Sequence, residues 1–276
     1  MLEFAICNEL QHADGLTLAQ QAEVAAALGY VGLELAPDTL GLAPHSMDAG
    51  DIYAIRGIVE RAGVRVTGLH WLLSGYPDAS ITDPAKWDET QTILIGLIDL
   101  CARLGGSVLV HGSPAQRGRP AGMTSEQLID HLASFFAPVA KAAQAAGVTY
   151  CIEPLSRQET DTITTVAEGA ALVEAVGNPA FRTMIDCKAA GLDEPPVAEL
   201  IRTWVPTGLI GHIHANDTNL GAPGMGRDPF PDIVRALLET QWSGPIGVEP
   251  FRTLIDARVT AAIGIATMRA CEKAAQ

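Results

Sequence analysis

The 276-residue sequence contains no cluster of basic residues and no apolar run long enough to cross a membrane. It has 32 acidic against 18 basic side chains, which gives a formal net charge of −14. Because nucleic-acid binding needs clustered lysine and arginine to neutralise phosphates, this charge argues against a nucleic-acid partner. A membrane-spanning helix needs about 20 mostly apolar residues, and no apolar run approaches that length. We therefore expect neither a nucleic acid nor a membrane as a partner.

The sequence also lacks a cysteine framework and a signal peptide. Its five cysteines form no Cys-x-x-Cys pair and are odd in number: Cys7, Cys101, Cys151, Cys187 and Cys271. The amino terminus, MLEFAICNEL, carries two acids and no basic segment, unlike a secretory signal. We expect free thiols in a reducing compartment, and hence a cytoplasmic protein.

Short apolar or β-branched runs recur at fairly even intervals and predict eight strands. They span residues 4–7, 31–35, 64–70, 108–111, 148–153, 182–186, 209–214 and 246–249. Segments with helical periodicity lie between them, and strands that alternate with helices imply parallel pairing. No glycine-rich dinucleotide fingerprint follows the first run, which disfavours an open sheet. Eight units in about 270 residues predict an α/β protein with a single (β/α)₈ barrel domain over residues 1–276.

Polar residues end the last four predicted strands, at the side of a barrel where active sites lie. Three are carboxylates and one is an imidazole: Glu153, Asp186, His214 and Glu249. Converging carboxylates repel one another, and a divalent cation relieves that repulsion. Oxygen ligands with one imidazole suit Mn²⁺, Mg²⁺ or Co²⁺ better than an ion that prefers thiolates. We predict one divalent metal ion at these four residues, most favourably Mn²⁺.

Three other histidines near strand ends are less specific. His70 and His111 follow the third and fourth runs, and each could equally be a hydrogen-bonded core histidine. His212 and His214 are two residues apart and therefore point to the same side of their strand. That spacing alone does not tell which of the two binds a metal.

Three segments resemble one enzyme family. CIEPLSRQET at 151–160 is similar to an IEPLNR-x-ET segment, GHIHANDTNLGAPGMG at 211–226 to a GH-x-H…N-x-x-x-PG-x-G run, and GVEPF at 247–251 to a closing EPF. These are motifs of the ketose 3-epimerases of the tagatose and allulose type, within the xylose-isomerase-like sugar phosphate isomerase/epimerase barrels. The resemblance implies the same four metal ligands as the strand ends, and a substrate contact at Glu159.

The activity that the resemblance implies is metal-dependent proton transfer beside the carbonyl of a small sugar. The metal would hold the ketose and stabilise an enediolate. Glu153 and Glu249 would act as acid and base on opposite faces of the sugar, one removing the proton and the other returning it. The resemblance therefore implies a sugar isomerase or epimerase with a small-molecule sugar substrate. A homodimer or homotetramer is in keeping with the family, although no sequence feature fixes an interface.

Two positions depart from the family pattern. Ala189 stands where the family has a histidine, and Leu220 where it has an arginine. Lys188 and His212 are candidates to take over their contacts with the sugar. His70, His111 and Arg117 are further candidate substrate contacts, the last two in a segment that could equally be a surface turn.

Other functions share these features in part. A keto-sugar dehydratase or lyase could use the same metal site, since elimination passes through the same enediolate. A trinuclear endonuclease IV-like barrel would need a histidine where Ala189 stands, and the charge of −14 offers DNA no binding surface. A sugar-binding barrel without catalysis would have to explain four convergent ligand-type residues by binding alone.

Overall fold

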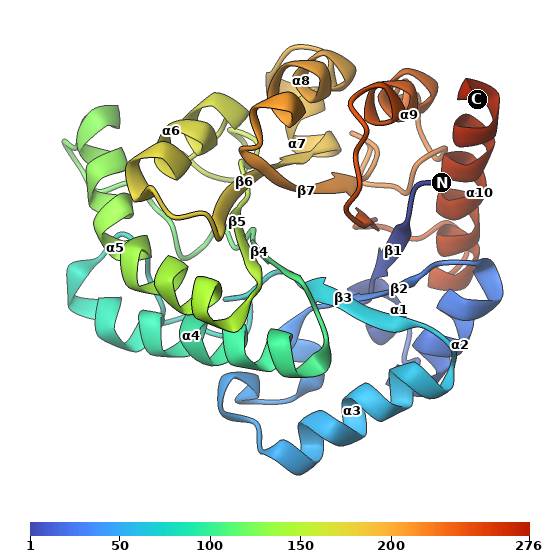
Figure 1. Ribbon diagram of the computed structural model, residues 1–276, viewed down its shortest axis with the longest axis horizontal. Coiled ribbons are helices and arrows are strands. Elements are labelled where there is room, and N and C mark those ends of the chain that lie inside the picture. The colour runs from blue at the N-terminus through green and yellow to red at the C-terminus, as the bar shows by residue number, and fades with distance from the viewer.

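The computed structural model describes residues 1–276 and has eight parallel strands that close into a barrel (Figure 1). Each strand overlaps one of the predicted runs, so the predicted (β/α)₈ barrel is confirmed. The strands are β1 (Phe4–Cys7), β2 (Gly32–Leu35), β3 (Arg65–Leu69), β4 (Val108–His111), β5 (Thr149–Ile152), β6 (Phe181–Asp186), β7 (Ile210–Ala215) and β8 (Ile246–Val248). They pair in chain order, and β8 pairs with β1 to close the ring.

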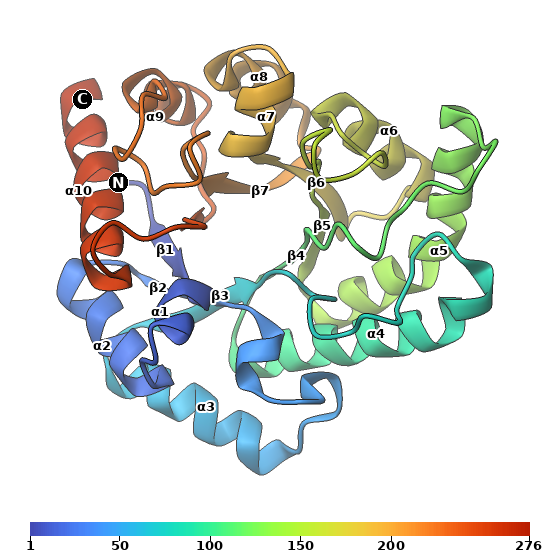
Figure 2. The ribbon, with the colours of Figure 1, turned by 180° about the vertical axis from the view of Figure 1, so that it is seen from behind.

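Helices surround the barrel on its outer side, as both face-on views show (Figures 1 and 2). The α-helices are α1 (Glu9–Ala13), α2 (Leu18–Leu28), α3 (Ala49–Arg61), α4 (Trp87–Leu104), α5 (Ser125–Ala146), α6 (Val166–Val176), α7 (Cys187–Asp193), α8 (Val197–Trp204), α9 (Phe230–Glu239) and α10 (Ala257–Ala275). Short 3₁₀ helices span Pro37–Leu40, Pro44–Ser46, Pro84–Lys86 and Val205–Thr207. None of the helices combines the length and apolar character that a membrane span requires.

Local sequence sets the ends of several helices. Thr17 and Thr124 form capping boxes at the starts of α2 and α5, each with a glutamine three residues later. Gly105 and Gly147 end α4 and α5 in the left-handed backbone conformation, which glycine adopts without a steric penalty because it has no Cβ atom. These caps fix where each helix stops and the chain turns back toward the next strand.

The apolar core has two parts. The larger part packs the outward faces of the strands against the helices. A small cluster of Val108, Val110, Cys151 and Met184 is separate from that layer. All five cysteines are buried and free, in keeping with the prediction of unpaired thiols. The strands therefore form a rigid frame whose ends position the polar residues described next.

Candidate active site

The four predicted ligand residues meet at the carboxyl ends of neighbouring strands. Glu153 follows β5, Asp186 ends β6, His214 lies in β7 and Glu249 follows β8. One ligand atom from each lies within 4.8 Å of the other three, and all four residues are buried. Parallel pairing sets this arrangement, since Asp186 lies opposite His214 and His214 opposite Gly247 in the sheet register.

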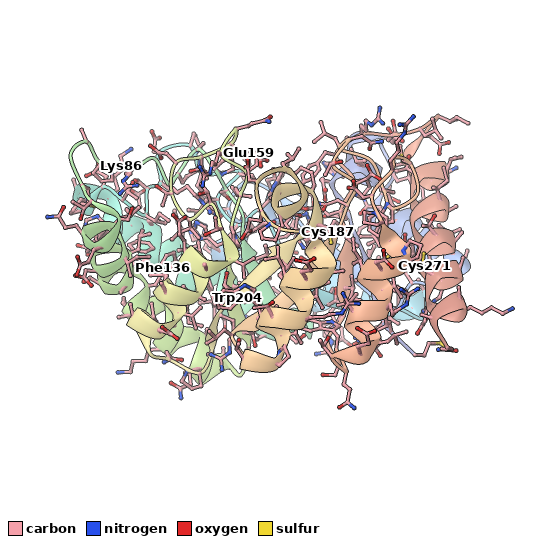
Figure 3. All side chains as sticks on the ribbon, turned by 90° about the horizontal axis from the view of Figure 1, so that it is seen from above. Lys86, Phe136, Glu159, Cys187, Trp204 and Cys271 are labelled. Carbon is pink, nitrogen blue, oxygen red and sulfur yellow. The ribbon has the colours of Figure 1, made fainter.

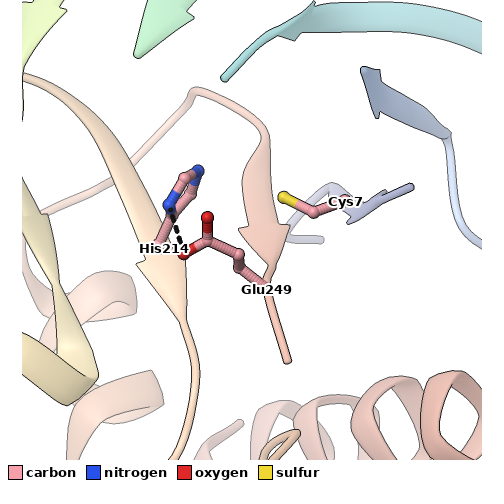
Figure 4. A group of neighbouring side chains, drawn as sticks. All are labelled: Cys7, His214 and Glu249. Atoms are coloured by element: carbon pink, nitrogen blue, oxygen red, sulfur yellow. Dashed lines mark ion pairs between the residues drawn. The ribbon is translucent and has the colours of Figure 1, made fainter. Parts of the chain in front are cut away.

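The ring of His214 is oriented by a carboxylate behind it. Its Nε2 lies 2.9 Å from Glu34 Oε1, a hydrogen bond from β7 to β2 across the barrel interior. Its Nδ1 faces the carboxylates, 3.0 Å from Glu249 Oε2, 3.6 Å from Glu153 Oε1 and 4.0 Å from Asp186 Oδ2. Figure 4 shows the Glu249 carboxylate directed at this nitrogen. Nδ1 nevertheless makes no geometrically acceptable hydrogen bond and is fully buried.

The charged groups around this nitrogen change one another's pKa values. Burial raises the pKa of Glu249 to about 8, and burial together with the charge of Glu153 raises the pKa of Asp186 to about 6. Burial alone would lower the pKa of His214, but the carboxylates of Glu249 and Glu34 raise it well above its usual value. Without a cation, the cluster therefore retains protons that exposed carboxylates would release.

Asn216 ties the ligand strands together from behind. Its Nδ2 donates to Asp186 Oδ2 at 2.6 Å and to Glu249 Oε2 at 3.2 Å. Its Oδ1 accepts the backbone N–H of Lys188 at 2.8 Å. Asp186 Oδ1 in turn accepts the N–H of Ala189 at the start of α7. One fully buried amide thus fixes two carboxylates and the first turn of α7.

A cavity of about 170 Å³ opens above the cluster. It is bordered by charged side chains near the cluster and by apolar side chains elsewhere. Its lining consists of Trp71, Gly112, Pro114, Glu153, Leu155, Glu159, Asp186, Lys188, Leu220, Glu249 and Phe251. In the view perpendicular to Figure 1, Glu159 lies near the upper rim of the molecule, and Trp204, which ends α8, lies farther from that rim (Figure 3). The cavity is therefore a small polar pocket with an apolar wall, at the carboxyl ends of the strands.

Backbone conformation at the cavity is specialised. A Cβ atom on Gly112 would lie 1.7 Å from Glu153 Oε2, so only glycine allows this carboxylate its position. Trp71 and Leu220, which line the cavity, have φ values of 52° and 71°. Non-glycine residues adopt such values at a cost of order 1–3 kcal/mol, and they cluster at functional sites.

Lys188 and Glu159 form an ion pair at the cavity wall. Lys188 Nζ lies 2.6 Å from Glu159 Oε1 and 5.0 Å from the centre of the Phe251 ring. The second Glu159 oxygen accepts the Ser156 hydroxyl at 2.6 Å, which holds the loop after β5. Both predicted substrate contacts therefore reach the cavity.

Two other predicted contacts lie behind the ligands rather than in the cavity lining. His212 Nε2 bonds Glu34 Oε2 at 2.9 Å, so Glu34 holds both histidines of β7. His70 Nε2 bonds Glu9 Oε2 at 2.8 Å and is fully buried. Burial alone would lower the pKa of His70, but Glu9 and Glu34 raise it to about 9. These two histidines are therefore hydrogen-bond partners of Glu34, which is fully buried, and of Glu9, which is partly buried.

His111 and Arg117 also lie outside the cavity lining. His111 Nδ1 bonds the Tyr150 hydroxyl at 2.6 Å, and its ring packs edge-on against Phe136 of α5, so it faces the helical layer. Arg117 is completely buried and donates to three backbone carbonyls, those of Ser113, His111 and Glu153. Arg117 thus anchors the segment after β4, in which Ser113, Gln116 and Arg117 are buried while Pro114 and Ala115 are exposed.

Sequence reasoning did not single out Glu34, Asn216, Glu9 or Cys7 as site residues. Glu34 was visible only as a polar residue inside an apolar run, and Asn216 as part of a longer motif. Cys7 lies close to His214 and Glu249 (Figure 4). Burial and the charge of Glu34 raise the pKa of its thiol well above the usual value, so it is protonated at neutral pH.

The donor set fits a divalent cation. His214 offers a buried, unpartnered Nδ1, while its other nitrogen is held by a carboxylate, the usual arrangement around a metal-binding imidazole. Three carboxylates face the same point, and burial raises the pKa values of two of them, Asp186 and Glu249. Oxygen donors with one imidazole are typical of Mn²⁺ and related ions.

Comparison with known proteins finds one matching family model and several sugar epimerases with similar sequences. A family model described as "Xylose isomerase-like TIM barrel" matches residues 22–271. The D-psicose 3-epimerase of Agrobacterium fabrum is 36% identical over 113 residues, which cover 41% of this chain and 38% of that protein. The L-ribulose 3-epimerase of Mesorhizobium japonicum is 28% identical over 183 residues, which cover 66% of this chain and 61% of that protein.

Each of these matches therefore spans less than two thirds of the relative's own length. A solved structure of an L-ribulose 3-epimerase superposes with a TM-score of 0.80 at 21% identity, covering 100% of this chain and 96% of the other. At that identity, the superposition establishes the shared fold.

Proposed function

The chain belongs to the xylose isomerase-like TIM barrel family, and from this premise we propose that it is a metal-dependent sugar epimerase or isomerase. Its substrate is a ketose or a related small polyhydroxy carbonyl compound. The observation that carries the proposal is the convergence of three carboxylates and the unpartnered Nδ1 of His214 below a cavity. We include in the proposal a single domain over residues 1–276, a homo-oligomeric state and a cytoplasmic location.

Glu153, Asp186, His214 and Glu249 would hold the cation, with Mn²⁺ favoured and Mg²⁺ or Co²⁺ as alternatives. The cation would supply Lewis-acid polarisation of the carbonyl group and offset the negative charge that develops there. Glu34 keeps the proton of His214 on Nε2 and leaves the Nδ1 lone pair free. Asn216 keeps the oxygens of Asp186 and Glu249 turned toward the same point.

Glu153 and Glu249 act as the acid and base pair in this proposal. They come from β5 and β8, on different sides of the barrel mouth, and both line the cavity. One carboxylate removes the proton from the carbon beside the carbonyl, and the electron pair moves toward the carbonyl oxygen. The other carboxylate returns a proton to the opposite face, which inverts that carbon. Burial keeps both carboxylates in a medium where proton transfer to carbon does not compete with bulk water.

The remaining cavity residues bind the sugar. Glu159 and Lys188 offer an acceptor and a donor for oxygen atoms, and Trp71 and Phe251 offer apolar faces to C–H groups. Trp71 and Phe251 lie with ring centres 6.2 Å apart on one side of the cavity. Four of the predicted substrate contacts do not line the cavity and have a structural role in this proposal: His70, His111, Arg117 and His212.

Proton NMR in D₂O tests this function. The metal-free protein is loaded with Mg²⁺ or Co²⁺ and incubated with a panel of ketopentoses, ketohexoses and keto-glycosides. We expect deuterium at the carbon beside the carbonyl, with the carbon skeleton intact and a new epimer or aldose present. A parallel sample without protein controls for exchange that the protein does not catalyse.

Other outcomes are distinguishable in the same spectra. Loss of water or of an aglycone would replace the epimerase proposal by a keto-sugar dehydratase or lyase. Absence of exchange with every member of the panel would contradict the proposed function.

A further inference from the structure

Lys188 is the only cationic side chain that lines the cavity. The other charged residues of the lining are the carboxylates of Glu153, Glu159, Asp186 and Glu249. Arg117, the nearest candidate in the sequence for a second cation, donates to backbone carbonyls instead. Negative charge that develops on a bound molecule therefore has Lys188 as its one positively charged protein partner.

The Lys188 ammonium group has unused hydrogen-bonding capacity. Its side chain is only 4% exposed, and it donates one hydrogen bond, to Glu159 Oε1. An ammonium group has three donors, so two N–H bonds lack a protein acceptor. Buried charged donors are costly without partners, and a polar molecule in the cavity would supply them.

Three contacts fix Lys188, one at its backbone and two at its ammonium group. The backbone N–H of Lys188 is bound by Asn216, the same amide that holds the Asp186 and Glu249 carboxylates. The ammonium group itself lies between Glu159 and the face of Phe251. The Asn216 side chain thus links Lys188 to the Asp186 and Glu249 carboxylates and fixes its position relative to them.

Ala189 follows Lys188 in α7, and Leu220 lines the same cavity as Lys188. Ala189 and Leu220 supply no donor, and Leu220 presents an apolar side chain to the cavity. His212, the other candidate replacement, is bound to Glu34 and does not line the cavity. Lys188 is therefore the one charged donor among the side chains that line the cavity.

We propose that Lys188 is a catalytic residue that donates a hydrogen bond to the carbonyl oxygen of the substrate and stabilises the negative charge on that oxygen, while Glu159 holds the ammonium group in place. This inference rests on the proposed epimerase or isomerase function and assigns the electrophilic contact within it.

The step balances without proton loss from Lys188. A cavity carboxylate takes the proton from the carbon beside the carbonyl, and the C–H electron pair forms the C=C bond. The carbonyl π pair moves onto oxygen, and the hydrogen bond that Lys188 donates to this oxygen strengthens. When the second carboxylate returns a proton to carbon, the electrons move back and Lys188 remains an ammonium ion.

Lys188→Met and Lys188→Arg test the proposal, with Lys141→Met as a control that removes the same charge from the exposed face of α5. We expect Lys188→Met to lower kcat by about 10²- to 10³-fold, the usual effect of losing one oxyanion donor. Lys188→Arg restores part of the rate because it keeps a cationic donor. The Mn²⁺ dissociation constant, measured by calorimetry, stays within about threefold of wild type, because the ligand side chains are untouched.

A binding experiment gives a readout that does not depend on turnover. In a Glu153→Gln background, calorimetry measures ketose binding with and without Lys188→Met. We expect about tenfold weaker binding without the ammonium group, the typical value of a hydrogen bond to a charged donor. The Lys141→Met control leaves both kcat and ketose affinity at the wild-type values.

The outcomes separate this inference from the proposed function. A wild-type enzyme that exchanges protons, together with Lys188→Met that keeps kcat and ketose affinity within threefold of wild type, overturns the role of Lys188 alone. A parallel loss of Mn²⁺ affinity and kcat also overturns it, because Lys188 would then act on the metal site. No exchange and no ketose binding by the wild-type protein overturns both proposals.

Discussion

Glu34 Oε1 lies 2.9 Å from His214 Nε2, and this contact between β2 and β7 sets which nitrogen of His214 faces the carboxylate cluster. The other Glu34 oxygen binds His212 at the same distance. Burial alone would raise the pKa of Glu34, but the two histidines hold it well below its usual range. An ionised Glu34 accepts a hydrogen bond from Nε2 of His214, so Nδ1 is the nitrogen that a cation binds when it displaces the proton there.

Glu34→Gln should therefore weaken metal binding without changing any ligand. Loss of a carboxylate that orients a ligand histidine typically costs 10- to 100-fold in metal affinity. We expect the Mn²⁺ dissociation constant, measured by calorimetry, to rise by about this factor. Glu23→Gln, at an exposed position of α2, is the matched control and should bind Mn²⁺ as the wild type does. Equal affinities of Glu34→Gln and wild type would show that His214 needs no such support.

The metal-free protein should lose stability as pH rises, and Mn²⁺ should restore it. Burial raises the pKa of Glu249 from 4.5 to about 8 and that of Asp186 from 3.8 to about 6. The folded protein therefore binds more protons than the unfolded chain between these values, so this contribution to the free energy of unfolding falls with rising pH. A bound cation replaces the protons. Calorimetry with EDTA or Mn²⁺ should show a larger Mn²⁺-induced increase in Tm near pH 8 than near pH 5.5.

Glu249→Gln tests the cause of this pH dependence. It removes a carboxyl group whose pKa burial raises to about 8, so Tm of the metal-free variant should change less between about pH 5.5 and pH 8 than that of the wild type. A Mn²⁺-induced increase in Tm that is the same at both pH values would contradict the assignment of these protons to the cluster.

The barrel was predictable because its signals are local and repeat. Eight apolar runs, each closed by a turn or a helix cap, leave few alternatives to a parallel barrel at this chain length. The strand-end rule then selected Glu153, Asp186, His214 and Glu249, and the structure brings their ligand atoms within 4.8 Å. Sequence alone identifies these positions, because the carboxyl ends of all eight strands of a parallel barrel lie at the same end of the barrel.

The partners behind the site were not predictable from spacing. Glu34 and His214 are separated by 180 residues, and their contact depends on how β2 and β7 face each other across a closed barrel. His111 and Arg117 were predicted as candidate substrate contacts from their place after a strand. The structure turns His111 toward α5 and Arg117 toward backbone carbonyls, because strand alternation and side-chain length decide direction.

Glu153→Gln and Glu249→Gln should each abolish epimerisation while the fold stays intact. Each variant removes one of the two groups that exchange a proton with carbon, and general acid–base groups typically contribute 10²- to 10⁴-fold. Because the two groups serve opposite faces of the sugar, each variant keeps one of them. We therefore expect one variant to exchange the proton of one epimer in D₂O, and the other variant to exchange the proton of the second epimer. NMR of both epimers with both variants measures this. Full epimerase activity in either variant would refute the assignment.

Arg117→Met should destabilise the fold and displace Glu153. The buried guanidinium donates to Glu153 O at 2.7 Å, to Ser113 O at 3.3 Å and to His111 O. Since His111 O also accepts the backbone N–H of Glu153 at 3.2 Å, loss of the guanidinium leaves two carbonyls without a donor. Each buried, unsatisfied polar group costs roughly 1–3 kcal/mol, and we expect the free energy of unfolding in urea to fall by about 3 kcal/mol. Arg56→Met, which removes an exposed ion pair with Glu60, should cost less than about 0.5 kcal/mol. Arg117→Lys keeps the charge but cannot reach three carbonyls at once, so it should be destabilised as well. If Arg117→Met unfolds at the wild-type urea concentration, the backbone of Glu153 is held by other contacts, and Arg117 has no positioning role.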